Sequence, residues 1–244
     1  MNIKLTLNYM GTAYHGWQRQ QNAVTVQQTL EEAFTALTGV HAPFIGCGRT
    51  DAGVHARGYV ANVRAETGIP MDKLPLALNA RLPRDISVYR AETVPEDFHA
   101  VFSCTAKEYT YTIQRGRVRD PFLNDRAMFI PTPLDVERMR TCAAEFLGEH
   151  DFAAVRSLGS NVTTTVRTVY DCEVTAGDDL ISIRIRASGF LYNMARAMAG
   201  TLVYAGLHKL GPGDISEILQ SGDRRLAGPT LEACGLCMTG VWYK

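Results

Sequence analysis

Apolar and polar residues alternate at the start of the chain. The stretch IKLTLNY (3–9) places an apolar side chain at every second position, which is the period of a strand with one buried face. Comparable alternation, or short runs of β-branched and aromatic residues, marks the other segments that we expect to be strands. These are 43–47, 55–65 and 86–94 in the first half, then 108–114, 166–176, 180–187 and 236–243 in the second.

Helical spacing of apolar residues marks the segments between these strands. The predicted helices cover 25–39, 74–82, 135–147, 190–207 and a short stretch that begins at Asp214. Thr25 and Gln28 are spaced as a capping box for the first helix, and Gly39 ends it. The third helix begins at the capping residue Asp135 and ends at a glycine.

The order of the predicted elements is β-α-β-β-α-β in each half of the chain. That order is typical of the ferredoxin-like unit, in which two helices cover one face of a mainly antiparallel sheet. We therefore expect an α+β protein with two domains, 1–105 and 106–244, joined near 103–107. A cleft between two such units is the usual place for a binding site.

Charge and composition limit the choice of partner. The net charge is zero, and 20 of the 25 basic residues are arginine. A neutral chain is no general nucleic-acid binder, but arginine is well suited to bidentate contacts with phosphate, so an RNA ligand stays open. The apolar segment 190–207 contains Arg196, which favours a buried helix over a membrane span. Sparse cysteines and the lack of a signal-peptide pattern predict a cytoplasmic protein.

The stretch GRTDAGVHA (48–56) carries the strongest chemical signal. Its glycine spacing fits a phosphate-binding P-loop, but the required lysine is missing. An aspartic protease would need a second such carboxylate, which the sequence lacks. A metal site would rest on Asp51, His55 and Cys47 alone, and the pair Cys234 and Cys237 is only half of a zinc site. We therefore expect no metal.

Six further motifs accompany this stretch, and together with it they resemble a known family in content and in order along the chain. GRTDAGVHA is similar to the signature of the TruA family of tRNA pseudouridine synthases, and the resemblance covers nearly the whole chain. It includes YHGWQRQ (14–20), LNARLPRDISV (78–88), DFHAVFSCTAKEYTY (97–111), LGEHDF (147–152), FLYNMARAMAGTL (190–202) and GPTLEACGL (228–236). The resemblance implies the pseudouridine synthase fold, with two ferredoxin-like halves flanking a central cleft.

The resemblance also implies an activity and its residues. The family isomerises uridine to pseudouridine at positions 38, 39 and 40 of the anticodon stem-loop of tRNA, as a homodimer and without a cofactor. By matching motif positions, Asp51 is the nucleophile, Tyr109 contacts the target base, and Arg196 faces the catalytic carboxylate. Arg49 has two open roles, because its guanidinium can keep Asp51 ionised or can contact the RNA backbone.

The chain departs from the family pattern at several positions. Met10, Tyr59, Asn193, Ala197 and Leu231 replace the usual residues, while Asp51, Arg49, Tyr109 and Arg196 are retained. The retained set argues against a catalytically silent RNA-binding protein. A glycoside hydrolase would need a second positioned carboxylate, for which the sequence offers no candidate.

One further basic segment has two readings. The alternating Arg115, Arg117 and Arg119 fit contacts with RNA phosphates and fit equally well the solvated face of a hairpin.

Overall fold

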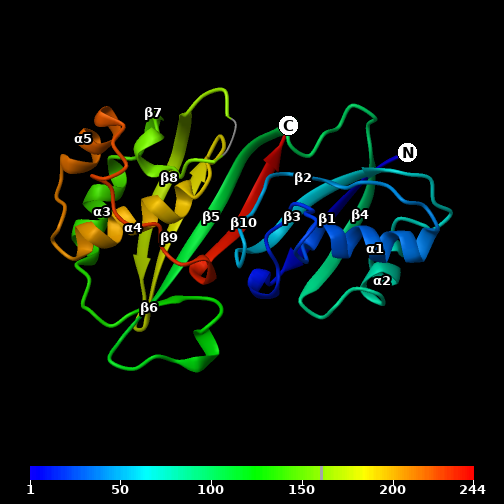
Figure 1. Ribbon diagram of the computed structural model, residues 1–244, viewed down its shortest axis with the longest axis horizontal. Helices are drawn as coiled ribbons and strands as arrows, with labels where there is room; N and C mark the ends of the chain where they lie inside the picture. The colour runs from blue at the N-terminus through cyan, green and yellow to red at the C-terminus, as the bar shows by residue number, and fades with distance from the viewer. Residues whose placement is uncertain (160–161) are drawn as a thin grey trace. The chain divides into compact units, whose positions relative to one another are not determined.

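The computed structural model describes residues 1–159 and 162–244 (Figure 1). The chain forms two compact units, one made of Met1–Thr105 with Cys237–Lys244 and the other of Ala106–Leu236. The last strand thus belongs with the N-terminal residues, whereas the sequence grouped it with the second half.

The first unit is built on an antiparallel sheet in the order β4-β1-β3. Its strands are β1 (Asn2–Tyr9), β2 (Ile45–Gly46), β3 (His55–Arg64), β4 (Ile86–Val94) and β10 (Leu236–Tyr243). The short β2 pairs with the C-terminal half of β3, while β10 runs parallel to the beginning of β3. The order β4-β1-β3-β2 is that of the ferredoxin-like unit predicted from the sequence.

Two helices cover one face of this sheet, α1 (Val26–Thr38) and α2 (Leu74–Asn79) (Figure 1). Helix α1 begins where predicted, because the Thr25 hydroxyl accepts a hydrogen bond from the Gln28 amide at 3.3 Å. The capping box is only half formed, since the Gln28 side chain instead donates to Glu32 at 2.8 Å. Gly39 ends the helix in the left-handed region at φ 74°.

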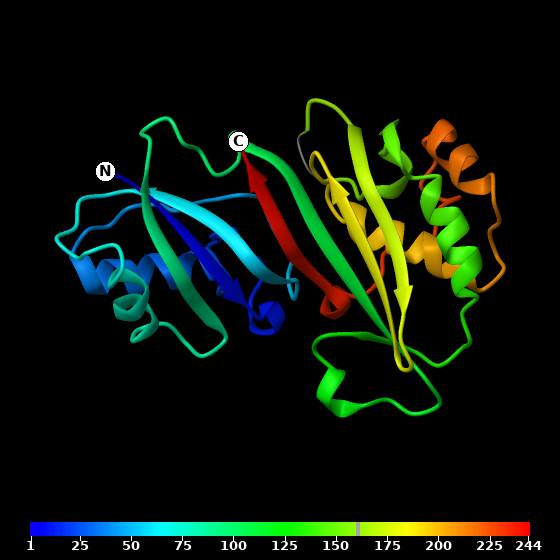
Figure 2. The same ribbon diagram turned by 180° about the vertical axis from the view of Figure 1, so that it is seen from behind.

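The second unit has a sheet in the order β5-β9-β8-β7, and all of these pairs are antiparallel. Figure 2 shows its helices together on one face of the sheet. The elements are β5 (Cys104–Arg115), β6 (Met128–Ile130), α3 (Val136–Ala144), β7 (Gly148–Asp151), β8 (Val166–Ala176), β9 (Leu180–Ala187), α4 (Met194–Gly206) and α5 (Asp214–Ser221). The mixed α/β architecture with mainly antiparallel strands, expected from the sequence, is confirmed.

Several details differ from the sequence prediction. Strands β6 and β7 were not expected, and short 3₁₀ helices occur at Gly11–Ala13, Pro121–Leu123, Ala153–Val155 and Ala233–Gly235. Helix α3 ends at Ala144, three residues early. Helix α4 begins at Met194 rather than just after Gly189, because Asn193 adopts a left-handed conformation at φ 60°. Among the described residues, no helix combines the length and the apolar character needed to cross a membrane.

Candidate active site

The loop that carries Asp51 joins β2 to β3 and is held by backbone hydrogen bonds. The Trp17 amide donates to the Thr50 carbonyl at 3.2 Å, and the Gly53 amide donates to the Tyr14 carbonyl at 3.1 Å. The loop closes on itself where the Val54 amide donates to the Asp51 carbonyl at 3.1 Å. Asp51 itself is half-buried. Its main chain is therefore fixed on both sides by the segment 14–17.

Glycine allows these two segments to approach so closely. Gly16 has φ +79°, and a Cβ added there would lie 2.2 Å from the Thr50 carbonyl oxygen. Gly11 has equally little space around it, since a Cβ added there would lie 2.0 Å from the Val54 carbonyl oxygen. The Gly11 amide also donates to Nδ1 of the buried His55 at 2.9 Å, which gives this histidine a structural contact.

Three aromatic residues support the same loop from inside the unit. The rings of Trp17 and Tyr59 stack with centroids 4.3 Å apart, and the Tyr9 ring meets Tyr59 edge-on at 5.5 Å. The hydroxyls of the two tyrosines bind the loop directly. Tyr59 donates to the Gly48 carbonyl, and Tyr9 shares a 2.8 Å hydrogen bond with the Thr50 hydroxyl. Tyr59, a departure from the family pattern, thus supports the Asp51 loop.

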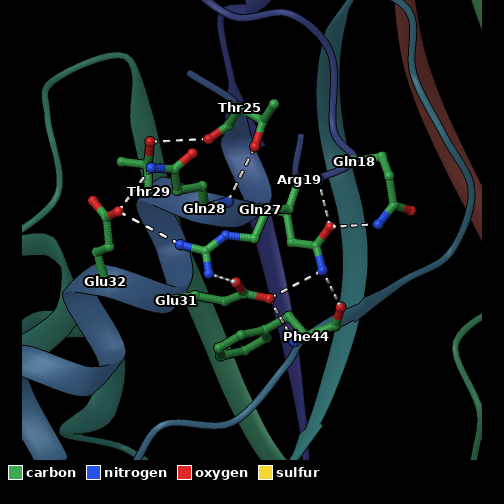
Figure 3. Close-up of polar contacts among 9 residues, drawn as sticks. All are labelled: Gln18, Arg19, Thr25, Gln27, Gln28, Thr29, Glu31, Glu32 and Phe44. Carbon is green, nitrogen blue, oxygen red and sulfur yellow. Dashed lines mark hydrogen bonds and ion pairs between the residues drawn. The ribbon is translucent and has the colours of Figure 1, made fainter. Parts of the chain in front are cut away.

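A buried polar network anchors the segment before the loop (Figure 3). The Glu31 carboxylate, 3% exposed, accepts from the Gln27 side chain at 3.0 Å and from the Phe44 amide at 3.1 Å. It also pairs with the Arg19 guanidinium at 3.2 Å. The Gln27 side-chain oxygen accepts from the Arg19 amide at 2.9 Å and from Gln18 at 3.0 Å. We call these contacts the Gln27–Glu31 network.

The network links α1 to Phe44, which directly precedes β2, and to residues 18 and 19, which closely follow the segment 14–17 that holds the Asp51 loop. Sequence analysis missed it, although a signal was present. Gln27 and Glu31 lie four residues apart on the face of α1 that otherwise buries Val26, Leu30 and Phe34. Polar residues on a buried helix face need hydrogen-bond partners, which here come from other segments.

We expect Glu31→Gln to lower the free energy of unfolding by about 1–3 kcal/mol, because the amide keeps the shape but has one acceptor oxygen for several donors. Glu32→Gln is the matched control. Glu32 is the next residue on the helix, is 62% exposed and contacts the same Arg19 at 3.7 Å. Its loss should change stability by less than about 0.5 kcal/mol. Urea unfolding of both variants measures the difference, and equal losses would contradict a special role for Glu31.

Arg49 lies beside Asp51 in sequence but does not bind it. Its side chain is exposed and forms no hydrogen bond or ion pair with any residue that the structure describes. Of its two open roles, contact with an external anion fits this arrangement better than neutralisation of Asp51.

Tyr109 lies in the second unit, on β5, opposite Ile185 of β9. It is 7% exposed, and its ring meets that of Phe190 edge-on at 4.8 Å. Tyr111, two residues on, is fully buried, and its hydroxyl donates to the Glu232 carbonyl at 2.8 Å. Tyr111 is thus a core residue of the second unit.

Arg196 lies in the first turn of α4 and is held by two neighbours. Its Nε donates to the Leu231 carbonyl at 2.7 Å, and its Nη1 donates to Oδ1 of Asn193 at 2.7 Å. The Asn193 amide nitrogen in turn donates to the Ser157 hydroxyl at 2.9 Å. Gly200 lets the segment 228–230 dock on the helix, because a Cβ there would lie 1.8 Å from the Pro229 carbonyl oxygen. The guanidinium is thus oriented rather than extended into solvent.

Two positions that depart from the family pattern, Asn193 and Leu231, supply these contacts. The Leu231 contact uses only the backbone carbonyl, and the Leu231 side chain is itself buried, at 4% exposed. Asp51 and Arg49 share one loop of the first unit, whereas Tyr109 and Arg196 belong to the second. The pairing of Asp51 with Arg196 stays a prediction.

The cysteine pair near the C-terminus behaves as ordinary thiols. Burial raises the pKa of Cys237 to about 11, and burial together with the nearby Glu232 raises the pKa of Cys234. Both therefore remain protonated at neutral pH and are poor metal ligands. Outside the two undescribed positions 160–161, no group of three His, Cys, Asp or Glu side chains is arranged to hold a metal.

Comparison with known proteins defines the class to which this loop belongs. A family model described as tRNA pseudouridine synthase matches residues 6–103 and 142–244. "tRNA pseudouridine synthase A" of Thermoanaerobacter sp. is 44% identical over 242 residues, covering 99% of both chains. The protein of the same name from Caldicellulosiruptor bescii is 46% identical over 242 residues, again covering 99% of both. The solved "Crystal Structure of a Cbf5-Nop10-Gar1 Complex" aligns with 97% of this chain and 48% of its own, at 14% identity and a TM-score of 0.40.

The matching family model and the relatives that align over nearly their whole length identify this protein as an isomerase that acts on RNA. The chain belongs to the tRNA pseudouridine synthase family, whose members convert uridine to pseudouridine in tRNA. The resemblance seen in the sequence is thereby confirmed.

Proposed function

We propose that this protein converts uridine to pseudouridine at positions 38, 39 and 40 of the tRNA anticodon stem-loop, with Asp51 as the nucleophile. The observation that carries the proposal is the fixed loop around Asp51. Backbone hydrogen bonds hold residues 50, 51 and 53, and buried aromatic hydroxyls hold Gly48 and Thr50. Such rigidity is what a catalytic carboxylate needs, because a misplaced group loses most of its effect.

The reaction is an isomerisation that requires no external redox partner. The N1–C1′ bond of uridine breaks, the uracil rotates, and a new bond forms from C5 to C1′. The proton on C5 leaves, and N1 gains one, so atoms and electrons balance. An ionised Asp51 promotes the first step by attack on the ribose or by assisting departure of the base. A free aspartate, with a pKa of about 3.9, is already ionised at neutral pH.

The other three residues have supporting roles in this proposal. A flipped base removes water from the carboxylate, which raises its pKa, and a guanidinium opposes that rise. We assign this role to Arg196, whose head is already oriented by Asn193 and the Leu231 carbonyl. Tyr109 offers its ring to the uracil. Arg49, exposed and without a protein partner in the described chain, contacts the RNA.

The deciding experiment is incubation with unmodified tRNA in buffer without an added cofactor. Digestion of the tRNA to nucleosides followed by chromatography separates pseudouridine from uridine, which has the same mass, and chemical mapping locates the modified positions. We expect pseudouridine confined to positions 38, 39 and 40. Pseudouridine elsewhere in the tRNA would overturn the site assignment, and none at all would overturn the activity.

We also propose a cytoplasmic homodimer in which one tRNA contacts both chains. The zero net charge supports this proposal, since one neutral chain has little general attraction for a polyanion and a second chain adds further contacts. Light scattering at assay concentration should give twice the mass of 26.9 kDa. An active monomer would contradict this prediction.

A further inference from the structure

The loop between β5 and β6, residues 116–126, extends beyond the end of the sheet of the second unit (Figures 1 and 2). Its backbone is nevertheless well anchored. The buried Gln114 side chain accepts from the Asp120 amide at 3.2 Å. The Asp120 carboxylate accepts from the Phe122 amide at 2.9 Å, and the Leu123 amide donates to the Asp120 carbonyl at 3.1 Å. The loop is therefore a fixed platform rather than a loose connection.

This platform presents apolar side chains to solvent. Val118 is 80% exposed and Phe122 is 83% exposed, although both stand only a few residues from the buried strand β5. The exposed Phe122 ring forgoes the roughly 1.5–3 kcal/mol that burial of a phenylalanine contributes to folding. It is thus available for contact with a ligand.

The arginines of this region separate into two groups. Arg115 is a structural residue, because its guanidinium donates to the carbonyls of Gly177 and Asp178 in the β8–β9 turn. Arg117 and Arg119 are exposed, and neither has a hydrogen bond or ion pair anywhere in the described chain. Of the three alternating arginines, Arg115 thus holds the β8–β9 turn, whereas Arg117 and Arg119 are exposed cations. Arg115 fits neither of the two readings left open by the sequence, and for Arg117 and Arg119 both stay open.

We propose that the loop 116–126 is an RNA-docking surface, on which Phe122 stacks against a tRNA base while Arg117 and Arg119 bind backbone phosphates. The proposal rests on the proposed function, which supplies tRNA as the ligand. Aromatic stacking joined to arginine–phosphate contact is the common way to hold unpaired nucleotides. A second copy of the chain fits less well, because a two-fold interface formed by this loop would bring identical guanidinium groups together.

The test is filter binding of unmodified tRNA to the full-length protein over a series of salt concentrations. Phe122→Ala should raise the Kd about tenfold, the effect of losing one stacked base. Arg117→Ala combined with Arg119→Ala should reduce the slope of log K against log salt by about 1–2. The matched controls are Phe102→Ala, whose ring is equally exposed at 83%, and Arg225→Ala, whose cation is already paired with Asp223 at 2.6 Å. Both should bind tRNA as the parent does.

The outcomes separate this proposal from the proposed function. With saturating tRNA, Phe122→Ala should retain the kcat of pseudouridine formation and change only KM. Unchanged Kd and salt slope in the loop variants would overturn the docking surface while leaving the enzyme intact. A lower mass of Phe122→Ala in light scattering would also overturn it, by showing contact between copies. Urea unfolding of Phe122→Ala checks that a loss of affinity does not come from misfolding, and its midpoint should equal the parent's, because the Phe122 ring is 83% exposed.

Discussion

Asp51→Asn should reduce pseudouridine formation by at least about four orders of magnitude and leave the Kd for tRNA within about twofold of the parent. The amide has the shape of the carboxylate but no charge, so it has little ability to attack the ribose or to stabilise loss of the base. Affinity should persist, because phosphate contacts by arginine supply most of it and Asp51 repels phosphate. Release of tritium from C5 measures the reaction, and filter binding on the same preparation measures docking.

Asp72→Asn is the matched control for this substitution. Asp72 is also in the first unit, but it is 71% exposed and, among the residues that the structure describes, it pairs only with the adjacent Lys73 at 3.6 Å. Removing its charge should change neither rate nor affinity. Pseudouridine formation by Asp51→Asn would show that the loop is not catalytic. A parallel loss of rate and affinity would show instead that Asp51 serves docking.

Strands and helices with strong local signals could be predicted from the sequence. The alternation in 3–9 and in 180–187 matches β1 and β9, and the capping residues Thr25 and Asp135 start their helices where expected. These features depend on side chains close together in the chain. Strands β6 and β7 have three and four residues, too few to show a period. They exist because neighbouring strands β5 and β8 offer hydrogen-bonding edges.

The candidate site shows the same division between local and distant signals. Asp51 and Arg49 were found because a contiguous motif contains them. The supports of that motif were not found, because each joins segments far apart in sequence. The Tyr59 hydroxyl reaches Gly48, and Glu31 reaches the backbone of Phe44. In the sequence, Tyr59 stands out only as a departure from the family pattern. In the structure its hydroxyl holds the Asp51 loop at Gly48, a contact that the sequence does not reveal.

The supports of the Asp51 loop suggest that its main chain, more than any single side chain, is the vulnerable part of the site. Three of the contacts that hold it are backbone hydrogen bonds, which side-chain substitutions do not remove directly. Only a residue that forces the two segments apart would disturb them all. Gly16 is such a position, because it lies against the carbonyl groups of the loop.

Gly16→Ala should lower kcat about a hundredfold, since a shift of about 1 Å in a catalytic group has that effect. The new methyl group would lie 2.2 Å from the Thr50 carbonyl oxygen, so the loop or the segment 14–17 must move. Alanine also tolerates the positive φ of 79° poorly. The two effects together should lower the free energy of unfolding by about 3 kcal/mol or more.

Gly39→Ala separates these two effects. Gly39 has nearly the same φ, 74°, but nothing lies within 4 Å of the position that a Cβ would occupy. It should therefore show only the backbone penalty, about 1–2 kcal/mol in urea unfolding, with the parent's kcat. Tritium release is measured for both variants at a temperature where each is fully folded. If Gly16→Ala retained the parent's kcat under those conditions, the close contact between residues 16 and 50 would not position Asp51. If Gly39→Ala lost activity to the same extent, the cause would be general destabilisation of the first unit.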